Sequence, residues 1–266
     1  MAYEHLAVER RGAVAVVTLN RPEKLNALNK GLQDESVAVC AEIEADDDVR
    51  VAIFTGAGRG FCAGADLTGA RAPDDDGPPP QLERLEEYGW VGRQGIALYR
   101  MTKPTIAAVN GVAAGAGMSF ALACDLRVGS ELTRFKTVFL ERSLSPDSGM
   151  SFFLPRIVGY SRAVDLIMTS RDVGGEEAYR LGLLDRFVPS DRLLDEALTV
   201  GNQMAIWPPM AVRSAKRVIQ RNLQHDLETA LREEYTGLNF ARRAPNDVRE
   251  SRASFVEKRA PRFTGT

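Results

Sequence analysis

Three short apolar segments organise the first half of the chain. They are "AVAVVTL" (13–19), "VAIFT" (51–55) and "TIAAV" (105–109). Apolar residues barely alternate with polar ones in these segments, which predicts strands that are buried on both faces. Each segment ends in a polar or glycine-containing turn, and the stretch 29–48 between the first two has apolar residues at roughly helical spacing. Strands and helices that alternate in this way predict an α/β fold.

The second half of the chain is mainly helical in pattern. Apolar residues recur at helical spacing in 161–170, 175–182, 191–206, 210–223 and 226–243. The segment "WPP" (207–209) should separate the third of these helices from the fourth, because proline lacks the N–H that a helix interior needs. We therefore expect an α/β body in residues 1–195 and a helical extension in residues 196–266.

Residues 71–101 fall into two parts. The stretch "RAPDDDGPPP" (71–80) is acidic and rich in proline, which predicts a mobile surface loop rather than a core element. Residues 81–101 follow it with a helical pattern.

The composition limits the possible classes of function. With 266 residues, 44% of them hydrophobic, the chain can build one large core or two small domains. Its 34 basic and 36 acidic residues leave a net charge of −2, so we expect no general attraction to nucleic acid or to an anionic membrane. Residues 211–266 are locally basic, with 12 Lys/Arg against 7 Asp/Glu. Charge alone favours a solvated helix face there, although such a region could also meet a small anionic ligand or an acidic partner surface.

The three cysteines, Cys40, Cys62 and Cys124, are scattered and form no C-x-x-C motif. We therefore expect neither a disulfide framework nor a metal site. The N-terminal segment lacks the apolar core of a signal peptide, and the longest apolar region, 106–124, is interrupted by Asn110 and by glycines. These features predict a cytoplasmic protein without a membrane span.

Three loops are rich in glycine, alanine or serine. They are "GAGRGFCAGADL" (56–67), "NGVAAGAGMSFALACD" (110–125) and "SPDSG" (145–149). Small residues let a ligand approach the backbone, and the start of a helix offers free N–H groups. Two such loops aimed at one point would form an oxyanion hole with two donors, although either loop alone could be an ordinary tight turn. The loops do not fit either of the two nucleotide-binding fingerprints, G-x-G-x-x-G and G-x-x-x-x-G-K-[ST].

Four motifs give the chain a family resemblance. They are "LNRPEKLNAL" (19–28), "GRGFCAGADL" (58–67), "VNGVAAGAGMSFALACDLRV" (109–128) and "RAPRFTG" (259–265). In order and spacing they resemble the crotonase, or enoyl-CoA hydratase/isomerase, superfamily over nearly the whole chain. The resemblance implies a spiral of β-β-α units with a C-terminal helical region that forms trimers, which often pair into hexamers.

The resemblance also implies the ligand. The substrate is expected to be an acyl-CoA thioester, with coenzyme A present only as part of the substrate and no other cofactor. Its carbonyl oxygen would accept hydrogen bonds from the backbone N–H groups of Ala65 and Ala116. Position 116 is commonly glycine in the family, but alanine keeps the same backbone donor. The residues implied in binding coenzyme A and the acyl group are Lys24, Leu25, Ala63, Asp66, Leu67 and Gly115, with Phe255 and Lys258 as C-terminal candidates that sometimes act from a neighbouring subunit.

Two departures from the family pattern bear on the reaction. Hydratases of the family use two glutamates to bind and activate water, and the motifs align these positions with Ser119 and Phe139. Neither residue can act as a general base, so both are expected to line the substrate site instead. Glu141 is close by, but only a local shift of register would bring it into the site. Hydration with two glutamates is therefore disfavoured.

Asp147 has two possible roles. An aspartate before Ser148 and Gly149 is a good helix N-cap, worth roughly 1 kcal/mol. However, "LSPDSGMSFFLPRIVG" (144–159) resembles the branch that includes the phenylacetate-pathway epoxyenoyl-CoA isomerase and some Δ3,Δ2-enoyl-CoA isomerases, in which one aspartate at this place faces the substrate. Moving a double bond needs one base that takes a proton and returns it two carbons away. We therefore predict that Asp147 is the shuttle base of a double-bond isomerase.

Two alternatives stay open. One is an enoyl-CoA hydratase that adds water to 2-enoyl-CoA. The other, of a different class, is a catalytically silent protein that binds coenzyme A within an assembly, which the loss of both glutamates would suit. A serine hydrolase is disfavoured, because Ser119 lacks a G-x-S-x-G context and because we expect His5 and His225 to be surface residues.

Overall fold

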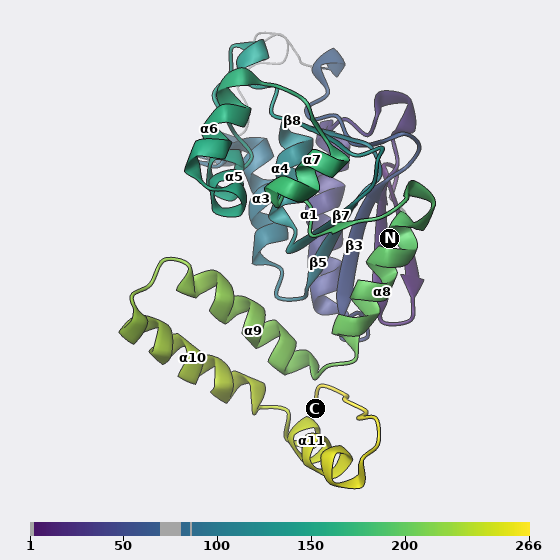
Figure 1. The fold of residues 1–266 in the computed structure, drawn as a ribbon, viewed down its shortest axis with the longest axis vertical. Helices are drawn as coiled ribbons and strands as arrows, with labels where there is room; N and C mark the ends of the chain where they lie inside the picture. Colours follow the sequence, from purple (N-terminus) through teal and green to yellow (C-terminus); the bar gives the residue numbers. More distant parts are fainter. Residues whose placement is uncertain (1–2, 70–80, 86) are drawn as a thin grey trace.

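Two sheets form the body of the protein (Figure 1). The structure is a computed structural model and describes residues 3–69, 81–85 and 87–266. The larger sheet consists, in spatial order, of β1 (Leu6–Arg11), β2 (Val14–Leu19), β3 (Val51–Gly56), β5 (Thr105–Val109), β7 (Leu126–Gly129) and β10 (Arg186–Phe187). The smaller sheet consists of β4 (Gly60–Cys62), β6 (Val112–Ala114), β8 (Arg134–Lys136) and β9 (Val173–Gly174).

The chain passes repeatedly from the larger sheet to the smaller one and then into a helix. The pairs β3–β4, β5–β6 and β7–β8 each follow this course, and the helices after them include α3 (Gly89–Arg100), α4 (Ala116–Ala123) and α5 (Met150–Val158). The strands that these pairs add are parallel within each sheet. This is the spiral of β-β-α units that the motifs implied, so the predicted fold is confirmed.

The three predicted strands are confirmed as β2, β3 and β5, and all five residues of β5 are buried. The helix expected between the first two strands is α1 (Lys30–Ala45), which begins where the Asn29 side chain accepts a hydrogen bond from the Leu32 N–H. Apolar side chains of the larger sheet lie in two clusters. One contains Val17 and Phe54, and the other contains Val16 and Ile53. Burial on both faces explains why these strands show little alternation.

The helices of the second half lie close to the predicted segments. They are α6 (Tyr160–Thr169), α7 (Gly175–Leu181), α8 (Leu193–Ala205), α9 (Pro209–Asn222), α10 (Leu227–Ala241) and the unpredicted α11 (Pro245–Glu257). The segment 81–101 is divided into α2 (Gln81–Arg84) and α3. Single 3-10 turns occur at Pro22–Lys24, Leu67–Gly69, Leu140–Arg142 and Ser190–Arg192. The loop predicted at 71–80 lies outside the described residues.

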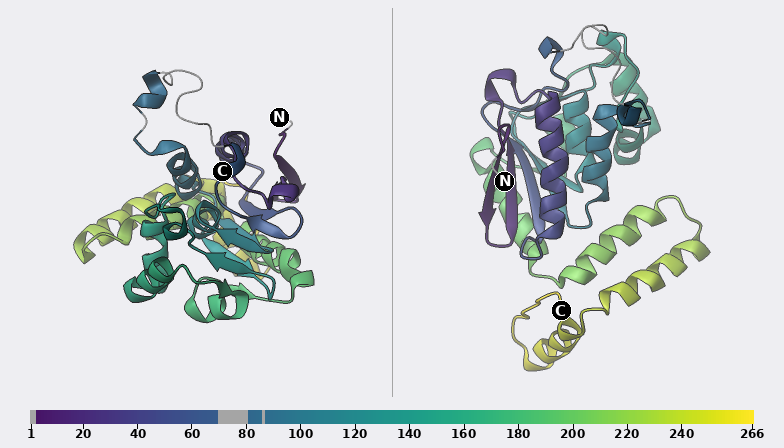
Figure 2. Two further views of the ribbon diagram at one scale, coloured as in Figure 1. Left: turned by 90° about the horizontal axis from the view of Figure 1, so that it is seen from above. Right: turned by 180° about the vertical axis from the view of Figure 1, so that it is seen from behind.

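The last three helices, α9 to α11, lie below the body and extend away from it (Figure 1 and the right panel of Figure 2). The division expected at residues 195/196 falls inside α8, whose Ala197 and Val200 belong to the same buried cluster as Val14 and Ile53. The change of character therefore lies after Ala205, where α8 ends, rather than at residue 195. The division into two folding units remains a prediction.

Candidate active site

Two loops of the predicted coenzyme A site lie side by side. The Leu28 N–H donates to the Gly64 carbonyl at 2.7 Å, and the Asp66 N–H donates to the Leu28 carbonyl at 2.9 Å. The Ala63 N–H donates to the Leu25 carbonyl at 3.0 Å. The structure therefore brings the sequence-predicted residues Leu25, Ala63 and Asp66 to one surface.

Asp66 is engaged within the protein. The Arg21 guanidinium contacts its carboxylate at 2.8 Å, and both the N–H and the hydroxyl of Thr68 donate to its other oxygen. Hydrogen bonds from Thr68 and Arg21 lower the pKa of Asp66 to about 2. Nearby, Lys24 is exposed, with its Nζ 3.4 Å from the Thr68 hydroxyl, and Leu67 is exposed as well. Asp66 thus shapes the loop, whereas Lys24 and Leu67 face solvent.

Two residues that the sequence did not single out hold these loops in place. One is Arg21. The other is Asn26, which is fully buried. Its side-chain oxygen accepts from the Arg21 N–H at 2.8 Å, while its Nδ2 donates to the carbonyls of Ala57 and Gly60 at 3.0 and 2.8 Å. Asn26 therefore ties both loops together through the backbone.

The predicted oxyanion donors lie where these loops meet α4. Ala116 is the first residue of α4, so its N–H precedes the hydrogen bonds of the helix. Among the described residues, no protein acceptor takes the N–H of Ala116 or that of Ala65. A Cβ built on Gly64 would lie 2.8 Å from the Ala114 carbonyl oxygen and 3.7 Å from the Ala116 nitrogen. The two loops are thus in contact, and each presents a free donor, as an oxyanion hole requires.

Gly115, which the motifs implied in substrate binding, is the residue before α4. Its N–H donates to the Lys136 carbonyl at 2.9 Å, and its φ of 50° favours glycine. A Cβ here would lie 3.0 Å from Val138. Gly115 therefore turns the backbone into α4 and so orients the Ala116 N–H.

The N-cap interpretation of Asp147 is wrong. The N-cap of α5 is Gly149, with φ 86°, and the Asp147 carboxylate accepts a hydrogen bond from the Ser148 hydroxyl at 2.8 Å instead. Ser148 and Gly149 both have positive φ, which turns the chain so that the carboxylate does not reach the first N–H groups of the helix. The Asp147 residue is exposed and remains available to a ligand.

Asp147 lines a cavity of about 430 Å³ between α3 and α5. The described residues of its lining are Tyr88, Gly92, Gly95, Ile96, Tyr99, Asp147, Ser148, Gly149, Phe152 and Phe153. The backbone of Asp147 also lies beside α4, because the Ser119 hydroxyl is 3.5 Å from its carbonyl oxygen. Ser119 follows Ala116 by about one helical turn, or ~5 Å along the axis. One helix therefore links the predicted donor to the turn that carries the predicted base.

The two positions where the family's hydratases carry glutamate are buried here. Ser119 is 1% exposed and Phe139 is 4% exposed. Glu141 is directed elsewhere, since its carboxylate lies 2.8 Å from the Lys136 ammonium. Hydrogen bonds with Lys136 and with Ser170 lower the pKa of Glu141. Among the described lining of the cavity, Asp147 is the one carboxylate.

Other reactive groups do not join the site. Cys62 lies in β4 beside the loops, but burial raises the pKa of its thiol to about 12, so it is not a thiolate near neutral pH. Phe255 is 84% exposed on α11, and Lys258 follows that helix. Since α11 lies below the body, away from α4 and α5 (Figure 1), the chain does not bring Phe255 and Lys258 to its own site.

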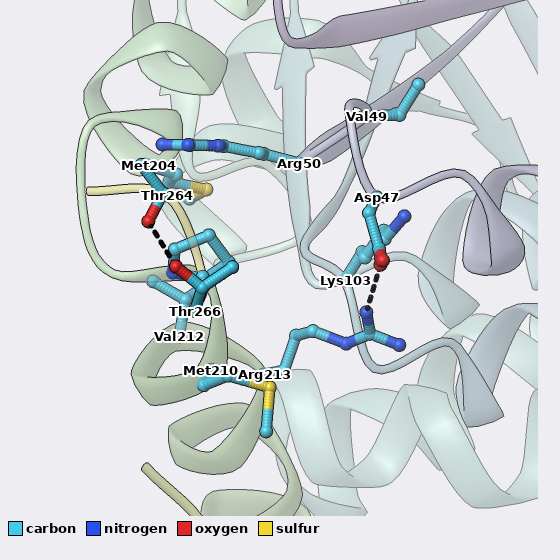
Figure 3. Close-up of a pocket in the computed structure, with 12 residues that line it drawn as sticks. Asp47, Val49, Arg50, Lys103, Met204, Met210, Val212, Arg213, Thr264 and Thr266 are labelled. Atoms are coloured by element: carbon cyan, nitrogen blue, oxygen red, sulfur yellow. Dashed lines mark hydrogen bonds and ion pairs between the residues drawn. The ribbon is translucent and has the colours of Figure 1, made fainter. Parts of the chain in front are cut away.

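A second cavity, of about 240 Å³, lies between the body and the C-terminal segment (Figure 3). Its lining includes Arg50, Lys103 and Arg213. The Arg213 guanidinium contacts Glu44 at 2.5 Å, Arg50 donates to the Ala205 and Phe263 carbonyls, and Lys103 donates to the Ile43 and Asp46 carbonyls. Each of these cations therefore already has a partner within the protein. Such contacts are typical of a region that holds two parts of a chain together rather than of a ligand site.

Comparisons of the chain with a family model, with related sequences and with solved structures all point to the same family. The model of the enoyl-CoA hydratase/isomerase family matches residues 9–266. The 1,2-epoxyphenylacetyl-CoA isomerase of Escherichia coli (strain K12) is 36% identical, over 95% of this chain and 95% of that protein. The short-chain-enoyl-CoA hydratase of Clostridium acetobutylicum is 35% identical, over 97% of each chain. The structure of the enoyl-CoA hydratase from Bacillus anthracis superimposes with a TM-score of 0.89 at 30% identity, covering 99% of this chain and 100% of that one.

Two further observations concern ligands and membranes. Within the described part of the chain, no group of three or more His, Cys, Asp or Glu side chains could hold a metal ion. No helix of that part is both long and apolar enough to cross a membrane. The relatives include an isomerase and a hydratase at nearly equal identity, so similarity alone does not choose the reaction.

Proposed function

Because the chain belongs to the enoyl-CoA hydratase/isomerase family and is an enzyme of that family, we propose that it moves a double bond in an enoyl-CoA thioester. One observation carries the proposal. Asp147 is the one carboxylate in the described lining of an apolar cavity, whereas the two glutamate positions hold Ser119 and Phe139. An acyl-CoA substrate fits the family of the chain.

The reaction needs one base and two donors. The Asp147 carboxylate takes a proton from C2 of a 3-enoyl-CoA, and the electron pair of that C–H bond moves toward the thioester oxygen. The N–H groups of Ala65 and Ala116 stabilise the negative charge that forms there. Protonated Asp147 then returns the proton to C4, the double bond settles between C2 and C3, and the carboxylate is regenerated. No water enters the product.

Hydration is the second candidate, because a relative of nearly equal similarity is named a hydratase. It needs a water molecule held in place, and misplacement by about 1 Å can cost ~10²-fold in rate. Ser119 and Phe139 provide no carboxylate to position that water, and Glu141 pairs with Lys136. These contacts favour isomerisation. A catalytically silent role is not supported by the family assignment.

Coenzyme A is proposed to lie along the paired loops. Lys24 is exposed and can meet a phosphate, while Leu25, Ala63 and Leu67 offer apolar contact. Asp66 is reassigned from ligand contact to loop support, because Arg21 and Thr68 already occupy its carboxylate.

The exposed apolar side chains of the last helices support a homotrimer or a dimer of trimers. They include Ile219, Leu223, Leu227, Leu231, Tyr235, Phe255 and Val256. Exposed apolar surface of this extent marks a contact surface. In such an assembly Phe255 and Lys258 could reach the coenzyme A of a neighbouring subunit.

Product analysis tests the reaction. With six-carbon thioesters, we expect 3-hexenoyl-CoA to become 2-hexenoyl-CoA faster than 2-hexenoyl-CoA becomes 3-hydroxyhexanoyl-CoA. Glu141→Gln should leave both rates unchanged, because the Glu141 carboxylate is paired with Lys136 at the surface. Hydration faster by about tenfold, or a large loss in Glu141→Gln, would contradict the proposal. Binding of both thioesters without turnover would support a silent protein instead.

A further inference from the structure

Three helices hold the backbone of the turn that carries Asp147. The Asp147 carbonyl oxygen accepts from the Met150 N–H of α5 at 2.9 Å and lies 3.5 Å from the Ser119 hydroxyl of α4. On the side of α3, a Cβ at Gly95 would lie only 3.1 Å from the Ser148 carbonyl oxygen, so glycine lets this helix approach the turn closely. Helix α4 packs against both α3 and α5 (Figure 1). The backbone of the turn is therefore fixed to the body of the protein.

The Asp147 carboxylate has less support than its backbone. Asp147 is exposed, and among the described residues the one hydrogen bond to its carboxylate comes from the Ser148 hydroxyl, 2.8 Å from Oδ1. An exposed side chain without contacts exchanges between rotamers, whereas a base reacts well only from an aligned position. Ser148 itself is only 9% exposed. A buried hydroxyl thus holds one oxygen of an exposed carboxylate and leaves Oδ2 available.

The backbone conformation of Ser148 does not favour serine. Its φ of 55° lies in the left-handed region, which glycine adopts more readily because it has no Cβ. Residues held in such conformations at a site are candidates for a functional role. The contact with the carboxylate is what serine provides at this position and glycine would not. Ser143 has a nearly identical φ of 54°, but it is exposed and lies outside the described lining of the cavity.

We propose that Ser148 is a positioning residue for the base: its hydroxyl holds Oδ1 of Asp147, so that Oδ2 takes the proton. This inference rests on the proposed function, since it concerns the same site. In the first step the C2–H bond breaks, an O–H bond forms at Oδ2, and the electron pair moves toward the thioester oxygen. In the second step Oδ2 returns the proton to C4. Ser148 keeps its own proton throughout and acts through Asp147 rather than on the substrate.

Ser148→Ala tests this role, because alanine lacks the hydroxyl but keeps the Cβ and its backbone preference. With 3-hexenoyl-CoA we expect kcat to fall by about tenfold or more, the scale of a hydrogen bond to a charged group, while KM stays within about threefold. Ser143→Ala is the matched control, since it makes the same change at nearly the same φ away from Asp147, and its kcat should equal that of the parent. A kcat of Ser148→Ala within about threefold of the parent would overturn the proposal.

Ser148→Gly separates the positioning role from backbone strain, and it also serves if Ser148→Ala does not fold. Glycine relieves the positive φ, so the midpoint of urea unfolding should be higher than that of Ser148→Ala. The kcat should nevertheless be as low as in Ser148→Ala, because the hydroxyl is still missing. Recovery of the parent kcat in Ser148→Gly would assign the effect to the backbone and contradict the proposal.

A double variant tests whether Ser148 acts through Asp147. In Asp147→Asn the base is absent, so adding Ser148→Ala should change the residual rate by less than about twofold, whereas independent effects would multiply. A loss as large as that in the parent background would show that Ser148 acts without Asp147, and the positioning role would be wrong.

The positioning role and the isomerase proposal fail separately. If the parent isomerises 3-hexenoyl-CoA and Ser148→Ala is equally fast, only the positioning role is overturned. If the parent hydrates 2-hexenoyl-CoA faster than it isomerises, and Ser148→Ala slows hydration by about tenfold, the isomerase is overturned and the positioning role is supported. If the parent turns over neither thioester, deuterium uptake at C2 of 3-hexenoyl-CoA in heavy water gives the same comparison of parent and variant, and a lack of uptake would overturn both proposals.

Discussion

The cavity beside Asp147 and the cavity beside Arg213 differ mainly in whether their polar groups already have partners within the protein. The first measures about 430 Å³ and is lined by rings, glycines and one carboxylate. The second measures about 240 Å³ and is lined by three cations and Asp47. In the first, the carboxylate has one neighbouring hydroxyl as a partner. In the second, the cations bond to Glu44 and to backbone carbonyls.

This difference shows how to distinguish a ligand site from a contact region that holds two parts of the chain together. A ligand gains most where polar groups lack partners, because it then replaces water rather than protein contacts. At Arg213 a ligand would have to break existing ion pairs between the C-terminal helices and the body. Near Asp147 it would meet an apolar wall and a carboxylate whose one described partner is the Ser148 hydroxyl. Mutations at the two places should therefore change different properties.

Asp147→Asn should show the largest effect on activity. The amide keeps the shape of the carboxylate but cannot accept a proton, and removal of a general base typically costs ~10²–10⁴-fold in rate. Binding of a saturated acyl-CoA and the unfolding midpoint should stay close to the parent values, because the carboxylate bonds only to Ser148 among the described residues. Steady-state kinetics, titration and thermal unfolding measure all three. A rate within about threefold of the parent would remove Asp147 from the mechanism.

Ala116→Pro should follow, with a loss of ~10²–10³-fold in rate, the usual scale for one oxyanion donor. Position 116 is the first residue of α4, where proline is well tolerated in a helix, so the substitution removes the N–H with little strain. Ala116→Gly keeps the N–H and is the matched control, with a rate close to the parent. A folded Ala116→Pro variant with a normal rate would exclude this donor.

Arg213→Ala should change stability and leave the rate constant intact. It removes the partner of Glu44 and of the Thr102 hydroxyl in a partly buried setting, and we expect a loss of about 1–3 kcal/mol. The control is Arg192→Ala, whose ion pair with Asp195 is exposed and worth less than about 0.5 kcal/mol. Urea unfolding measures both. A large loss of kcat in Arg213→Ala would mean that the contact between Arg213 and Glu44 supports the active site.

Asp66→Asn should have the smallest effect, and one that depends on pH. The folded pKa of Asp66 is about 2, below the ordinary value of 3.8, so the unfolded chain binds more protons between these values. The ionised carboxylate therefore stabilises the fold above about pH 4, by about 1–2 kcal/mol, and this gain is lost as the pH falls toward 2. Unfolding of parent and variant at pH 6 and pH 2.5 should show a clearly smaller difference at pH 2.5, because the gain is lost as the pH falls through the folded pKa of about 2. A difference of the same size at both pH values would assign the effect to shape rather than charge.

The sequence predicted best those strands and helices whose apolar residues form a clear pattern along the chain. Strands β2, β3 and β5 are long and buried on both faces, so their apolar runs are visible. The strands β9 and β10 have two residues each, which is too short for any pattern, and five of the six residues of β1 are exposed. Helix α11 was missed because its buried residues are the polar Asp247 and Ser254.

The candidate site was predictable only where a motif marks it. Ala65, Ala116 and Asp147 stand in motifs of the family, but Arg21 and Asn26 are polar loop residues whose hydrogen bonds link distant segments. The N-cap role, which was the alternative for Asp147, is not observed, because the positive φ values of Ser148 and Gly149 cannot be deduced from a local preference. The ring-lined cavity forms where α3 packs against α5, and a local sequence pattern does not show how two helices pack.

The separation between the backbone of Ala116 and the side chain of Asp147 has an evolutionary consequence. The proposed oxyanion donors are main-chain N–H groups, that of Ala116 at the start of α4 and that of Ala65 in the loop after β4, so side chains nearby can change without removing them. The acid stands on a separate turn, and positions 119 and 139 stand on α4 and before a 3-10 turn. On the proposed assignment, a change of acid could therefore change the reaction while the backbone donors to the thioester stay in place.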